Sequence, residues 1–89
     1  MHGNVWSEQM AFSKACIIRN VSATGARIDL ASGTIRAHLL TGTITLYFQS
    51  DNREIDCQVM WRTGRSIGVR FVGSFRPPTR QYGARSAAS

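Results

Sequence analysis

The sequence predicts an all-β domain, because apolar and polar residues alternate over several short runs and no segment shows the apolar stripe of an amphipathic helix. Six such runs fit within the 89 residues of the chain. We expect a six-stranded antiparallel barrel, since closing the sheet removes the exposed edges that an open sheet would leave. Side chains fill the interior of so small a barrel, so a ligand is expected on its outer surface.

The clearest strands lie in the middle of the chain. "TITLYFQ" and "EIDCQVMWR" alternate strictly, so every second side chain of each run points to one face. The side chains expected in the core from these two runs are Ile44, Leu46, Phe48, Ile55, Cys57, Val59 and Trp61. The full set of expected strands is 5–9, 12–20, 25–30, 43–49, 54–62 and 66–72.

Turn residues separate these strands. "WRTGRSIGVRF" has a Gly-containing turn at residues 63–65 between two apolar runs, which is typical of a hairpin. Ile67, Val69 and Phe71 continue the core face beyond that turn. Residues 31–42, "ASGTIRAHLLTG", are expected to hold at most a short helical turn.

The chain divides into a barrel domain, residues 1–75, and a basic, flexible C-terminal tail, residues 76–89. Pro77 and Pro78 prevent a further strand, and the last residues are expected to fray. The net charge of +6 is shared equally, because residues 1–72 carry eight basic and five acidic side chains while residues 73–89 add three arginines and no acid. Ten arginines against one lysine hint at an anionic partner.

Several functional classes are not expected. No apolar run approaches the roughly 18 residues that a membrane span requires, and no secretory signal is present, so we expect a cytoplasmic protein. Cys16 and Cys57 lack metal-ligand spacing and are expected as buried thiols, without a metal or other cofactor. Neither His2 nor His38 has a neighbouring carboxylate or nucleophile in a triad-like pattern, so the chain is not expected to be an enzyme.

One turn carries more than ordinary turn chemistry. Asn20, Ser22 and Gly25 form the pattern N-x-S-x-x-G between two strands, and Arg19 and Arg27 flank it. Asn and Ser side chains bond to nearby backbone groups and Gly adopts conformations closed to other residues, so a tight turn explains the pattern on its own. The same residues offer an amide, a hydroxyl and an accessible backbone to a ligand.

The context of this turn resembles the PilZ domain family. "CIIRNVSATGARI" contains the family's D/N-x-S-x-x-G motif, and about thirty residues later "CQVMWRTGRSIGVRF" is similar to the W-R, turn and I-G-V-x-F strand of many bacterial members. The resemblance covers residues 5–72. It implies a six-stranded antiparallel barrel in a bacterial, cytoplasmic, non-enzymatic signalling module.

The resemblance also implies a ligand, cyclic di-GMP. In the family, the motif approaches a guanine and its ribose-phosphate, which assigns ligand binding to Asn20, Ser22 and Gly25, with Arg19 and Arg27 as flanking cations. A second family element, an R-x-x-x-R stretch before the first strand, has no counterpart in "MHGN". Truncating a buried charged partner costs about 2–5 kcal/mol, so binding is expected to be weakened unless other arginines substitute.

Two alternatives remain beside cyclic di-GMP binding. A degenerate PilZ domain would not bind the dinucleotide and would act as a protein–protein adaptor, with the motif kept as a turn. A basic barrel that binds nucleic acid is the third hypothesis, from the sequence pI of about 10.7. Specific nucleic-acid binding is the least favoured, because most aromatic side chains are expected in the core and not on a stacking surface.

Overall fold

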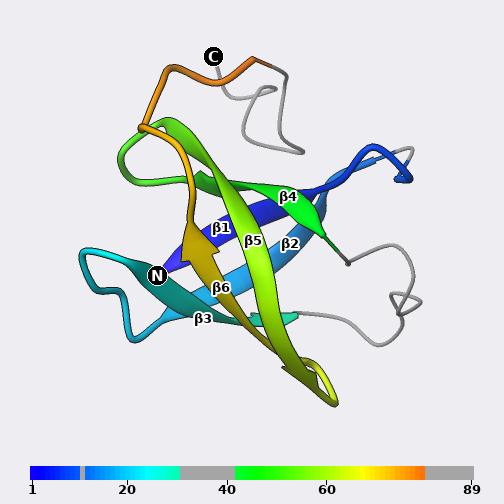
Figure 1. Ribbon diagram of the computed structural model, residues 1–89. Coiled ribbons are helices and arrows are strands. Elements are labelled where there is room, and N and C mark those ends of the chain that lie inside the picture. The colour runs from blue at the N-terminus through cyan, green and yellow to red at the C-terminus, as the bar shows by residue number, and fades with distance from the viewer. Residues whose placement is uncertain (11, 31–41, 80–89) are drawn as a thin grey trace.

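Six antiparallel strands close into a barrel in the computed structural model, which describes residues 1–10, 12–30 and 42–79 (Figure 1). The strands are β1 (His2–Trp6), β2 (Lys14–Arg19), β3 (Gly25–Leu30), β4 (Thr43–Phe48), β5 (Arg53–Thr63) and β6 (Ser66–Phe71). Around the barrel they follow the order β1-β2-β3-β6-β5-β4, and β4 pairs with β1 to close it. The described residues contain no helix, and the predicted all-β barrel is confirmed.

The predicted boundaries hold best for the last four strands and worst for the first. Residues 5–9 were expected as a strand, but β1 ends at Trp6 because the chain then turns, and the Met10 N–H donates to the Ser7 carbonyl at 3.0 Å. The short helical turn expected within residues 31–42 falls almost wholly on residues 31–41, outside the described part of the chain.

The barrel interior is a continuous apolar core. Its buried members are Val5, Met10, Cys16, Ile18, Ala26, Ile28, Leu30, Ile44, Leu46, Phe48, Ile55, Cys57, Ile67 and Val69. Both cysteines are buried and free, as expected. Burial raises the pKa of each thiol to about 12, because a thiolate would lose its hydration inside the barrel. The inward positions predicted for β4 and for the first half of β5 are therefore confirmed.

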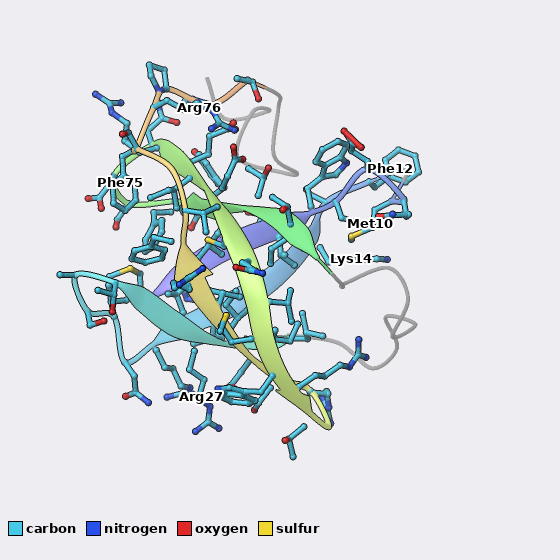
Figure 2. The ribbon with its side chains drawn as sticks, in the orientation of Figure 1. Met10, Phe12, Lys14, Arg27, Phe75 and Arg76 are labelled. Carbon is cyan, nitrogen blue, oxygen red and sulfur yellow. The ribbon has the colours of Figure 1, made fainter. Side chains whose placement is uncertain are left out.

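Three phenylalanines cover one end of this core. Phe48 and Phe71 come from β4 and β6, and Phe75 lies on the segment that follows β6 (Figure 2). Phe75 makes edge contacts with both, with ring centroids 5.4 Å from Phe48 and 5.8 Å from Phe71. Such aromatic pairs contribute about 0.5–1.5 kcal/mol each beyond the area they bury.

A buried ion pair holds the segment after β6 against the barrel. Glu54 on β5 is fully buried, and its carboxylate accepts hydrogen bonds from the Arg76 Nε at 2.8 Å and from the Thr79 N–H at 2.9 Å. The Arg76 guanidinium also reaches Asp56 at 3.0 Å, and this bond lowers the pKa of that carboxyl.

Arg76 and Thr79, which we assigned to the start of the tail, thus contact β5 through both side chains and backbone. Arg76 and Glu54 also exchange backbone hydrogen bonds of 3.0 and 2.9 Å, which forms an isolated bridge next to the end of β6. The boundary at residue 75 and the flexibility of the remaining tail stay predictions.

Replacing Arg76 by Ala is expected to lower the free energy of unfolding by about 2 kcal/mol, because it removes the charged hydrogen bonds that the half-buried Arg76 makes to the buried Glu54 carboxylate. Urea denaturation measures the change. The control is Arg65→Ala, which removes an equal charge from the exposed β5–β6 turn and is expected to stay within about 0.5 kcal/mol of the parent. Equal stabilities of the two variants would show that the ion pair does not hold the segment.

Candidate functional site

The N-x-S-x-x-G motif forms the turn between β2 and β3. Asn20 has a φ of 53°, a left-handed conformation that Asn tolerates better than most residues. The Ser22 N–H donates to the Gly25 carbonyl at 2.8 Å, while the Ser22 hydroxyl oxygen accepts from the N–H groups of Thr24 and Gly25, both at 3.3 Å. The motif is therefore a self-bonded turn whose residues 20–24 are exposed to solvent.

Gly25 has a structural reason to be glycine. It pairs with Arg70 where β3 meets β6, and a Cβ atom at this position would overlap the carbonyl oxygen of Val69. No side chain can therefore be added without moving the β6 backbone. Gly25 therefore allows β3 and β6 to approach each other, and it places no side chain on the surface beside the turn.

Trp61 lies on the outer face of the barrel, so the prediction that it packs in the core is wrong. Val59 pairs with Val69, but Trp61 pairs with Gly68, so β5 carries one extra residue in a β-bulge. A bulge reverses the alternation of side chains between the two faces. Trp61 consequently remains 47% exposed, and Arg62 instead lies opposite the inward residue Ile67.

Gly68 provides the space that the indole occupies. A Cβ at Gly68 would overlap the indole ring of Trp61, so the ring lies directly over the glycine backbone of β6. Register places Arg19, Arg27, Gly68 and Trp61 in one row across β2, β3, β6 and β5. An aromatic ring and two cations thus share one stripe of the outer surface.

These elements surround a shallow open hollow of about 400 Å³. Its lining combines the motif turn, β3, β5 and β6: Asn20, Ser22, Thr24, Gly25, Ala26, Arg27, Met60, Trp61, Gly68, Val69 and Arg70. Hollows of this size are in the range of small-molecule sites. The surface combines an aromatic face, two guanidinium groups and the exposed polar turn.

The cations of this region are partly neutralised. Arg19 and Arg27 both bond to Asp29, with Nε–carboxylate distances of 2.7 and 3.1 Å. The Ser66 hydroxyl donates to the same carboxylate at 2.7 Å, and this bond is the main cause of a lowered pKa for Asp29. Arg70, at the other side of the hollow, donates to the Gln58 amide oxygen at 2.9 Å.

Four of the five predicted site residues line the hollow. They are Asn20, Ser22, Gly25 and Arg27. The fifth, Arg19, is on β2, where it pairs with Arg27 of β3 and lies outside the lining. Sequence reasoning missed Trp61, Arg70 and Asp29. A glycine inside a strand marks a bulge or a close contact, so Gly68 was the signal that could have placed Trp61 on the outer face.

The described residues form no metal centre, because no three of their His, Cys, Asp or Glu side chains lie close enough together to hold an ion. Within the same residues, no helix has the length and apolar character that crossing a membrane demands. The residues around the hollow can stack on a ring, form hydrogen bonds and attract anions.

The family model for the PilZ domain matches residues 9–82 of the chain. The chain therefore belongs to the PilZ domain family, whose members are associated with cyclic di-GMP signalling. No curated protein and no solved structure matches the chain. The match covers β2 to β6, which carry the motif turn and every residue that lines the hollow.

Exchanges of Gly25 and Ser22 for Ala should show which of these two motif residues the stability of the fold depends on. Gly25→Ala is expected to cost about 1–3 kcal/mol of unfolding free energy, because β6 must shift to accept the Cβ. Ser22→Ala is expected to cost less than about 1 kcal/mol, since the hydrogen bonds of its hydroxyl are long and wholly or partly exposed to solvent. Thermal unfolding compares them, and a Gly25→Ala variant as stable as the parent would contradict the close approach of β3 and β6.

Proposed function

We propose that this PilZ domain is a non-enzymatic cytoplasmic receptor module that binds cyclic di-GMP on the outer surface of its barrel. One observation supports the proposal above the others: the motif turn and the indole of Trp61, distant in sequence, border the same hollow. Family membership alone leaves open which surface a ligand uses. The hollow offers a surface with the required chemistry.

The groups around the hollow suit the two parts of a guanine nucleotide. Trp61 presents a half-exposed ring on which a base can stack, and such stacking is worth about 1–3 kcal/mol. Among the described residues, the Asn20 side chain has no hydrogen-bond partner, so its amide is available to a base edge. Arg27 and Arg70 are exposed and can each offer two parallel N–H donors to a phosphate.

Binding is expected to be modest. The family's R-x-x-x-R element has no counterpart at the first strand of this sequence, and here Arg19, Arg27 and Arg70 would substitute for it from β2, β3 and β6. Each of the three already bonds to another side chain. Part of the energy gained from a phosphate would therefore be spent on releasing or sharing these bonds.

The alternative function is a protein–protein adaptor that does not need the nucleotide. Exposed apolar side chains favour it, in particular Val72 and Phe75, which are 48% and 50% exposed beyond the end of β6. In this case the motif is retained for its turn and for the contact of Gly25 with β6.

Calorimetric titration with cyclic di-GMP tests the proposal. The parent protein is expected to bind one site saturably, and Trp61→Ala is expected to lower the affinity at least tenfold, because it removes the stacking surface. Phe12→Ala is the control: it removes an 80% exposed aromatic side chain that does not border the hollow, and it should bind like the parent.

No heat and no rise in melting temperature with millimolar ligand would remove cyclic di-GMP binding and leave the adaptor function. Saturable binding that Trp61→Ala leaves unchanged would place the ligand elsewhere on the barrel.

A further inference from the structure

Asp29 is the only acidic side chain on the described part of β3, and it holds both arginines that flank the motif turn. Its carboxylate accepts from the Arg19 Nε through one oxygen, at 2.7 Å, and from the Arg27 Nε through the other, at 3.1 Å. The three side chains share the outer face of β2 and β3 and are partly exposed, at 56%, 45% and 24% for Arg19, Arg27 and Asp29.

This arrangement answers an electrostatic problem. Arg19 and Arg27 are directly opposite each other in the β2–β3 pairing, and like charges at such positions repel. An anion between them relieves the repulsion. In the absence of a ligand, Asp29 is that anion, and it supplies the same charge and the same kind of paired oxygen acceptors as a phosphate.

We propose that Asp29 is an internal competitor of the ligand phosphate, which occupies Arg19 and Arg27 and thereby weakens dinucleotide binding. The inference rests on the proposed function, since Arg27 lines the hollow proposed for the ligand, and it names Asp29 as a residue that limits the affinity. A phosphate that approaches Arg27 must displace the carboxylate or accept a second negative charge close by.

A second contact makes the competitor hard to displace. The Ser66 hydroxyl on β6 donates to the Asp29 carboxylate at 2.7 Å, and Ser66 also accepts from an Nη of Arg27 at 3.3 Å. Asp29 is thus anchored from the strand that also carries Gly68 and Arg70. The same bond lowers the pKa of Asp29, so the carboxylate carries its charge at neutral pH.

Asp29→Asn tests the inference, because it keeps the shape of the side chain and removes its charge. In calorimetric titration with cyclic di-GMP, this variant is expected to bind about tenfold more tightly than the parent, which corresponds to about 1.4 kcal/mol. Asp51→Asn is the matched control. It makes the same change of net charge in the exposed β4–β5 turn and is expected to alter the affinity less than twofold.

The gain must also depend on the two arginines. In a chain that carries Arg19→Gln and Arg27→Gln, adding Asp29→Asn is expected to have no effect on binding. Ser66→Ala removes the anchor of the carboxylate together with the hydroxyl that accepts from Arg27, and both losses free the two groups for a ligand. This variant is expected to tighten binding about threefold and serves as the second variant should Asp29→Asn unfold.

The outcomes separate the inference from the proposed function. Parent protein that binds as tightly as both Asp29→Asn and Ser66→Ala overturns the competitor role and leaves cyclic di-GMP binding intact. A gain that persists without the two arginines also overturns it. If neither the parent nor any variant gives binding heat with cyclic di-GMP, the proposed function is overturned, and the competitor role of Asp29 with it.

Discussion

The extra residue of β5 between Val59 and Trp61 governs how the outer surface of this barrel is organised. Before the bulge, alternate side chains of β5 such as Ile55 and Cys57 point into the core. After the bulge, the alternation is reversed, so Trp61 points outward. The indole moves from the core face to the outer face, where Gly68 leaves room for it. Without the bulge, Trp61 would join the core, and the hollow beside the motif turn would lose its aromatic side.

The walls of the hollow belong to strands and to a tight turn. Gly25 lets β3 approach β6, and the antiparallel ladder then fixes Arg27, Gly68 and Trp61 in one row. At another part of the barrel, the ion pair of Glu54 with Arg76 keeps Phe75 over the end of the core. Phe75 and Arg76 lie far from Arg27 in Figure 2. Sites built on strands keep their geometry better than sites on loops, which favours a ligand that finds its surface already formed.

Alternating residues were enough to predict the barrel, since Ile44, Leu46, Ile55 and Cys57 follow a strict period of two and are all buried. The motif turn was likewise predictable, because Asn20, Ser22 and Gly25 are turn-forming residues at fixed offsets. The period cannot report a bulge, so Trp61 was assigned to the wrong face. Nor can it report long-range ion pairs: Asp29 meets Arg19 only through strand pairing, and Glu54 meets Arg76 only because the chain returns to β5.

The proposed function depends most on one contact, the stacking of a guanine of cyclic di-GMP on Trp61, and the two tryptophans of the chain allow a direct test of it. Trp6 donates its indole N–H to the Met10 carbonyl at 3.1 Å and does not border the hollow, so it serves as an internal reference. In ¹H–¹⁵N spectra recorded during a titration with cyclic di-GMP, the indole resonance of Trp61 should shift progressively to saturation, while that of Trp6 stays in place. A Trp61 resonance that remains unmoved at millimolar ligand would contradict stacking of the guanine on this side chain.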